Sequence, residues 1–94
     1  MIKGIHHVAL KCCGNEEFEK VVGFYRDVLG LEVLRSWSEG MMLTTGAGII
    51  EIFNNGDDHP SQGAIRHFAF CTDNVDEVAE AVRSAGYEVF IEPK

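Results

Sequence analysis

The chain has 94 residues, enough for one small domain but not for two independent cores. With 46% hydrophobic and 24% charged residues, its composition is typical of globular proteins and excludes intrinsic disorder. Eight basic and fifteen acidic residues give a net charge of −7, which would repel the phosphate backbone of a nucleic acid. No apolar run approaches the roughly 20 residues that span a bilayer, so we expect no membrane partner.

Cysteine usage and the first residues indicate the compartment. The chain has three cysteines, and two of them, Cys12 and Cys13, are adjacent. An odd number with this spacing does not suit a disulfide framework and indicates free thiols in a reducing compartment. The first residues lead into a strand-like segment rather than a signal peptide. We therefore expect a cytoplasmic protein.

The first half of the chain predicts one strand, one helix and three further strands. Residues 5–12 form a short apolar segment with β-branched side chains, which indicates a strand. Apolar residues at helical spacing predict a helix over 16–29, with Asn15 as its cap and Gly30 as the glycine that ends it. Short apolar segments separated by turns predict further strands at 31–37, 41–45 and 49–53.

The second half repeats the start of this pattern. Residues 56–64 are polar and contain glycine and proline, which indicates a linker. After the linker we expect a strand at 65–72, a helix capped by Asp73 or Asn74 and ended by Gly86, and a strand at 87–91.

Two short motifs show that the restart is an internal repeat. His7-Val8-Ala9-Leu10 and His67-Phe68-Ala69-Phe70 share the pattern His-x-Ala-apolar, and each precedes a predicted helix and a Gly-apolar-Glu-Val segment. A repeat determines architecture more firmly than any single propensity. We therefore expect a complete βαβββ module over 1–55, a linker over 56–64 and a partial βαβ module over 65–94, two strands short.

Side-chain alternation along the strands predicts which residues share a face. On the first strand, Val8 and Leu10 supply the apolar face for the helix, so His7 should project from the opposite face. The same alternation places His67 on the equivalent face of its own strand. In the fourth strand, Glu51 lies between apolar residues and needs a partner, because burying an unpaired charge is costly.

Two imidazoles and one carboxylate on one face suit a divalent metal ion with open coordination positions. The same residues also admit structural interpretations. A histidine on a strand is most often a surface residue, and Glu51 could pair with Lys11 or Arg66. The repeat and the shared alternation favour the metal site over these alternatives.

Four segments, in order along nearly the whole chain, carry a further signal: residues 4–10 (GIHHVAL), 24–33 (FYRDVLGLEV), 50–53 (IEIF) and 66–70 (RHFAF). The second is a specific signature, and the others are weaker when taken singly. Together they resemble the vicinal oxygen chelate superfamily of glyoxalases, bleomycin-resistance proteins and dioxygenases. The resemblance implies an α+β fold, an open barrel of paired βαβββ modules, with the second module lacking its last two strands.

The resemblance also implies roles for individual residues. His7, Glu51 and His67 match the family's metal-ligand positions, for a divalent ion such as nickel, zinc, cobalt or manganese. Glu51 is then also the candidate catalytic base, while His6 matches no ligand position and is expected to pack or to lie at the rim. A glutamate at this position resembles the glyoxalase I pattern, whereas epimerases of methylmalonyl-CoA tend to carry glutamine. The family's fourth ligand, a glutamate, falls beyond Lys94. Either water or a group from another chain completes the shell, or the sequence is an incomplete form that lacks this strand, and the sequence alone is equally consistent with both.

Three residues are candidates for binding the substrate. Asn55 matches an asparagine that contacts glutathione in glyoxalase I. Lys11 lies where that enzyme usually has an arginine, and lysine keeps the charge without the bidentate fork. We expect Phe53 to line the pocket.

The function implied is a metal-dependent lyase or isomerase of the glyoxalase I type, lactoylglutathione lyase. It would transfer a proton through a metal-bound enediolate on a small oxygenated substrate, such as a glutathione adduct. The alternatives are a protein that sequesters a ligand or drug, as bleomycin-resistance proteins do, and another metalloenzyme such as an epimerase or dioxygenase. Because the chain is small and the missing strands would leave a sheet edge open, we expect a homodimer.

Overall fold

The computed structural model describes residues 1–58 and 65–93. The chain forms two compact units, Met1–His59 and Pro60–Lys94. Most of the predicted linker, 56–64, lies outside the described residues. Among the described residues, no helix combines the length and the apolar character that crossing a bilayer requires.

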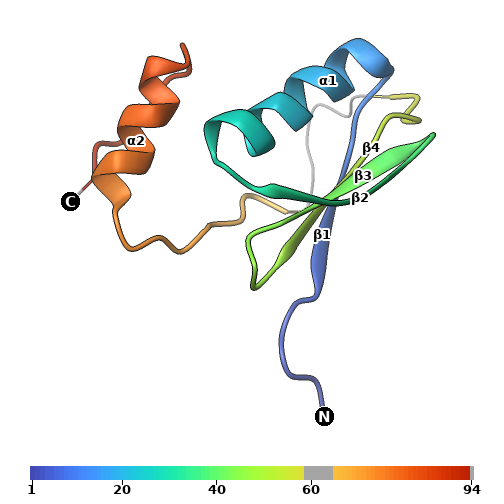
Figure 1. Cartoon of the computed structure of the whole chain (residues 1–94), viewed down its shortest axis with the longest axis horizontal. Coiled ribbons are helices and arrows are strands. Elements are labelled where there is room, and N and C mark those ends of the chain that lie inside the picture. The colour runs from blue at the N-terminus through green and yellow to red at the C-terminus, as the bar shows by residue number, and fades with distance from the viewer. Residues whose placement is uncertain (59–64, 94) are drawn as a thin grey trace. The chain divides into compact units, whose positions relative to one another are not determined.

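The first unit contains a four-stranded mixed sheet in the order β1-β4-β3-β2 (Figure 1). β1 runs parallel to β4, while β4 and β3, and β3 and β2, are antiparallel neighbours. A parallel pair needs a long connection, which here contains the helix and the two intervening strands. This is the βαβββ module that the sequence predicts, with strands β1 (His7–Lys11), β2 (Glu32–Trp37), β3 (Gly40–Thr44) and β4 (Ile49–Phe53).

The predicted helix over 16–29 consists of two parts. The α-helix α1 (Asn15–Gly23) is followed by a π-helical segment, η1 (Phe24–Val28). Gly30 has a φ of 79°, the left-handed conformation expected of the glycine after a helix.

The predicted cap of this helix is wrong by one position. Asn15 is the first helical residue, and the cap is Gly14, which has a φ of 92° and no side chain. The carbonyl oxygen of Gly14 accepts the N–H of Phe18, and the Glu17 carboxylate accepts the N–H of Cys13 at 3.2 Å. A left-handed backbone favours glycine at the cap, so α1 has no side-chain cap, and the Glu17 carboxylate binds back to the chain that leads into the helix.

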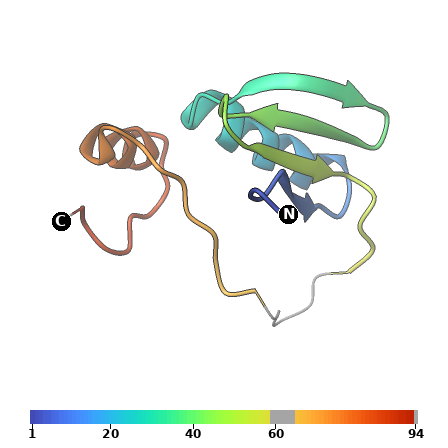
Figure 2. The same cartoon turned by 90° about the horizontal axis from the view of Figure 1, so that it is seen from below.

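α1 covers one face of the sheet, as Figure 2 shows, and the core lies between the two. Alternate residues of the strands supply this face, and Val8 and Leu10 on β1 belong to it as predicted. The opposite face therefore carries His7, Ala9 and Lys11. The buried core consists of Cys12, Phe18, Val22, Leu31, Leu43, Ile50 and Ile52.

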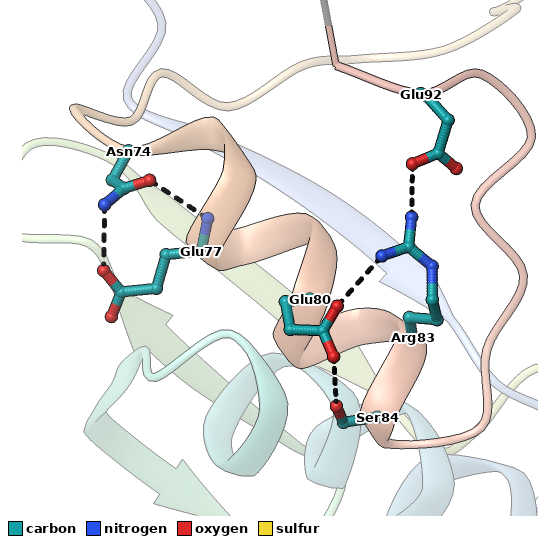
Figure 3. A network of polar contacts seen from close by, with 6 residues as sticks. All are labelled: Asn74, Glu77, Glu80, Arg83, Ser84 and Glu92. Carbon is teal, nitrogen blue, oxygen red and sulfur yellow. Dashed lines mark hydrogen bonds and ion pairs between the residues drawn. The ribbon is translucent and has the colours of Figure 1, made fainter.

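The second unit contains one regular element, the helix α2 (Val75–Ser84). Asn74 caps it, one of the two predicted candidates: its side chain accepts the N–H of Glu77 at 3.0 Å and donates to the Glu77 carboxylate. Figure 3 shows this cap and a second cluster, in which Arg83 pairs with Glu80 at 3.0 Å and with Glu92 at 2.5 Å. These pairs are exposed, so each contributes little to stability.

The two strands predicted around α2 differ from the structure. Residues 65–72 and 87–91 form no β-bridges, although Gly86 takes the predicted left-handed conformation with a φ of 92°. A strand requires a neighbour that pairs with its backbone N–H and C=O groups, and neither segment has one among the described residues. No residue of α2 is buried within the described residues.

Candidate functional site

The face of the sheet opposite α1 carries the candidate residues of the first unit. In the register, Glu51 on β4 lies between Ala9 on β1 and Met42 on β3. Because residues in register project to the same side, His7, Lys11 and Phe53 share this face with Glu51. We call it the open face.

His7 and Glu51 are brought together as the sequence predicts. The Nε2 atom of His7 lies 3.6 Å from Oε1 of Glu51. The Glu51 side chain is only 12% exposed, whereas that of His7 is 42% exposed. A small residue, Ala9, faces Glu51 across the register, which leaves room for the imidazole beside the carboxylate.

The Glu51 carboxylate accepts no hydrogen bond within the part of the chain that the structure describes. Of the two structural partners that the sequence suggests, Lys11 pairs with Asp58 instead, and Arg66 belongs to the second unit. Within the first unit, the contact that Glu51 makes is with His7. No side-chain oxygen of the described residues is both fully buried and unpartnered, so the Glu51 carboxylate stays open to water or to a bound cation.

This pair of donors fits a divalent metal ion. Two ligands of one zinc ion, each about 2.1 Å from it at the tetrahedral angle, lie about 3.4 Å apart. The observed separation of 3.6 Å is close to that value. In residues 1–58 and 65–93, no group of three His, Cys, Asp or Glu side chains is assembled. His67 belongs to the second unit, and its role as a third ligand stays a prediction.

His6 contacts His7, which the strand alternation does not predict. Its Nδ1 atom lies 3.0 Å from Nδ1 of His7, and the two rings meet edge to face at 85°. β1 begins at His7, so His6 precedes the paired strand and alternation does not direct its side chain.

Lys11 and Asn55 are both engaged by acidic side chains. Lys11 donates to the Asp58 carboxylate, and this hydrogen bond raises the pKa of Lys11 above its ordinary value. Asn55 donates from Nδ2 to the Glu39 carboxylate at 3.2 Å. Their predicted roles in binding a substrate stay predictions, and each side chain would first have to leave its acidic partner.

The open face also carries an aromatic cluster, of which the sequence predicted only Phe53. Trp37, Gly40 and Phe53 are register neighbours across β2, β3 and β4. The Trp37 and Phe53 rings meet edge to face, with centroids 5.8 Å apart, and the Arg35 guanidinium lies 4.8 Å from the Trp37 ring centroid. The strand alternation puts Arg35 and Trp37 on the same face of β2, so their contact could be predicted from the sequence. The contact of Trp37 with Phe53 could not, because the sequence alone does not give the register of β2, β3 and β4.

Gly40 makes this cluster possible, although the sequence predicts it to be a turn residue. A Cβ atom at Gly40 would lie 2.7 Å from the carbonyl oxygen of Ile52 and 2.8 Å from the Trp37 ring. The bare glycine therefore lets the indole pack directly over the backbone of β3, an arrangement known in sheets as aromatic rescue.

Replacing Gly40 by alanine is expected to displace both the indole and the β3–β4 pairing. We expect a loss of about 1–3 kcal/mol of unfolding free energy, the usual cost of overpacking. A change in tryptophan fluorescence should accompany it, because Trp37 is the only tryptophan of the chain. Thermal unfolding followed by fluorescence measures both effects.

Gly48→Ala is the matched control, because its new Cβ would meet only the Thr45 hydroxyl at 3.9 Å. Equal stabilities for the two alanine variants would contradict the steric argument.

The cysteines are free, as predicted, and they occupy different environments. Cys12 is 1% exposed in the core, and burial raises the pKa of its thiol. The Sγ atom of Cys13 lies 3.3 Å from the carbonyl oxygen of Asp58, while Cys71 is exposed. A thiol with a raised pKa is a poor nucleophile, so Cys12 acts as a packing residue.

Comparison with known proteins identifies the family. Residues 4–94 match the model of the Glyoxalase/Bleomycin resistance protein/Dioxygenase superfamily. The chain belongs to this superfamily. The family expected from the sequence is therefore confirmed, as is an α+β fold with a glyoxalase-like βαβββ module. Members of the superfamily typically bind a divalent metal ion, act on small-molecule substrates and often dimerise.

Three solved structures illustrate the similarity. An integron cassette protein, HFX_CASS4, from the mobile metagenome of the Halifax Harbour sewage outfall is 27% identical, with a TM-score of 0.68 over 90% of this chain and 72% of that one. The protein SMU.1112c is 26% identical, with a TM-score of 0.73 over 92% and 77%. Lactoylglutathione lyase from Agrobacterium tumefaciens is 24% identical, with a TM-score of 0.70 over 97% and 76%, a likeness that shows the fold alone. A search of the curated proteins found no match.

Proposed function

We propose that this chain is a metal-dependent enzyme of the glyoxalase type, acting on a small substrate with two neighbouring oxygen atoms. The observation that carries the proposal is the pair formed by His7 and Glu51. A nitrogen and an oxygen donor lie 3.6 Å apart on the open face of the sheet, and the carboxylate has no hydrogen-bond donor within the described residues.

In this proposal His7, Glu51 and His67 hold a divalent metal ion such as nickel, zinc, cobalt or manganese. The bound ion would polarise the substrate oxygens and stabilise negative charge that develops on them. Nitrogen and carboxylate donors suit all four of these ions, so the donor set alone does not select one.

Glu51 has a second role, the transfer of a proton. A carboxylate can remove a proton from the carbon that bears one substrate oxygen and return it to the neighbouring carbon. The proton lost from the first carbon is the proton gained by the second, so the reaction is an isomerisation that needs no oxidant or reductant. The Glu51 side chain, in register with Ala9 and Met42, is itself only 12% exposed, so few water molecules reach the carboxylate.

The rest of the substrate would pack on the aromatic cluster. Phe53 and Trp37 form an apolar wall on the open face, and Arg35 brings a positive charge to its edge. Lys11 and Asn55 could contribute once released from Asp58 and Glu39. A glutathione adduct has both apolar and carboxylate parts, and it is the substrate class that we propose.

The test is a metal titration of the full chain, followed by an isomerase assay. We expect the wild-type protein to bind about one equivalent of Zn²⁺ or Ni²⁺, and we expect His7→Ala and His67→Ala each to lose most of that affinity. The loaded protein should then convert the hemithioacetal of methylglyoxal and glutathione into a thioester, which is followed by its absorbance.

Glu32→Gln, which changes an exposed carboxylate on β2, serves as the control and should bind metal like the wild type. If the wild-type chain binds none of these ions, the enzyme proposal is wrong. A ligand-sequestering role of the bleomycin-resistance type, using the aromatic cluster alone, would then be favoured.

A further inference from the structure

His6 contacts the candidate metal ligand His7, although it lies before the first paired residue of β1. Its Nδ1 atom lies 3.0 Å from Nδ1 of His7, within hydrogen-bonding distance, and the ring centroids are 5.2 Å apart. In a neutral imidazole one ring nitrogen carries a proton and the other carries a lone pair. A hydrogen bond between the two Nδ1 atoms therefore contains a single proton, supplied either by His6 or by His7.

The choice of donor determines whether His7 can bind a metal. If His7 donates from Nδ1, its Nε2 carries a lone pair on the side of Glu51 and is available as a ligand. If His6 donates, the proton of His7 is on Nε2, which then cannot bind a metal ion.

The distance to Glu51 favours the first arrangement. An Nε2–H group facing a carboxylate would form a charge-assisted hydrogen bond of about 2.7–2.9 Å. The observed Nε2-to-Oε1 distance is 3.6 Å, beyond that range and close to the separation of two ligands of one ion. At this distance Nε2 of His7 donates no hydrogen bond to Glu51, and the separation is compatible with both atoms binding one metal ion.

We infer that His6 is a positioning residue, which accepts the Nδ1 proton of His7 and so directs the Nε2 lone pair of His7 to the metal. The inference rests on the proposed function. Metal-binding histidines in general donate their second ring nitrogen to an acceptor, most often a carboxylate, a carbonyl or water. Here the acceptor is a second imidazole from the preceding residue.

The inference predicts a specific pattern of zinc affinities. In a titration of the full chain with Zn²⁺, His6→Ala should weaken binding by about 10- to 100-fold, the usual cost of losing such an acceptor. His6→Asn should restore most of the affinity, because the amide oxygen of asparagine can accept the same proton. Ile5→Ala is the matched control, since Ile5 is 81% exposed and adjacent, and should bind like the wild type.

Nitrogen NMR of the zinc-loaded protein shows directly which ring nitrogen of His7 carries the proton. A role of His6 in packing alone would not change the position of this proton. With ring-labelled histidine, His7 should be protonated on Nδ1, with a slowly exchanging proton and a scalar coupling to Nδ1 of His6. In His6→Ala that proton should exchange rapidly with water.

The outcomes separate the two proposals. Equal zinc affinity in wild type and His6→Ala would overturn the role of His6 and leave the metal site intact. Binding by His6→Asn that is as weak as that of His6→Ala would also overturn this role, because an acceptor would then be insufficient. A wild-type chain that binds no zinc would overturn the proposed function, and the role of His6 with it.

Discussion

Replacement of Glu51 by glutamine is expected to abolish most of the isomerase activity while the protein still binds metal. Glutamine keeps a carbonyl oxygen that can bind the ion, and epimerases of the superfamily tend to carry glutamine at this position. An amide cannot act as a base, however, so we expect turnover to fall by about 100- to 10,000-fold, the usual contribution of a positioned general base. Turnover of the hemithioacetal and a parallel metal titration measure the two effects.

Two further variants complete this experiment. Glu51→Leu removes both the base and the oxygen ligand, so its metal affinity should be far lower than that of Glu51→Gln. Glu32→Gln makes the same chemical change on the exposed edge strand β2 and should leave both quantities unchanged. Near wild-type turnover in Glu51→Gln would show that another group moves the proton.

Replacement of Leu43 by alanine is expected to cause the largest loss of stability. Leu43 is 0% exposed on the central strand β3 and belongs to the core between the sheet and α1. Leucine-to-alanine changes at such positions cost about 3 kcal/mol, from lost burial and from the cavity that remains. For a chain of this size, that corresponds to a melting temperature lower by about 12–24 °C. Thermal and urea unfolding measure the change.

Leu34→Ala is the matched control for this prediction. Leu34 is 56% exposed on the edge strand β2, so the same substitution should alter the unfolding free energy by no more than about 0.5 kcal/mol. A similar loss in both variants would mean that Leu34 is buried in solution, for instance against a second copy of the chain.

The sequence predicts the first module closely because each of its elements has a local signal. β4 matches its predicted bounds, Ile49–Phe53, and β1, β2 and β3 differ from theirs by a few residues at the ends. The predicted cap of α1 is wrong by one position because the left-handed backbone at Gly14 favours a glycine there, which carries no capping side chain. Asn74, by contrast, caps α2 and is one of the two predicted candidates, because its side chain acts within its own turn.

In the candidate site, too, some contacts follow from local signals in the sequence and others do not. Alternation along β1 and β4 puts His7 and Glu51 on one face, and the contact between them follows once the two strands are neighbours. Alternation does not predict the contact of His6 with His7, because His6 lies before the first paired residue of β1. Alternation also does not predict the cluster of Trp37 and Phe53, because this cluster depends on the register of β2, β3 and β4.

By itself, the sequence determined the family, the order of elements in the first module and the face on which His7 and Glu51 lie. The family follows from the resemblance of four short segments. The other two follow from periodicity, turn residues and a repeated motif, all of which act over short stretches of chain. Only the tertiary structure decided the strand register, the packing of Trp37 over Gly40 and the engagement of Lys11 by Asp58. These depend on residues far apart in sequence, whose side chains meet only when the sheet pairs and the core closes.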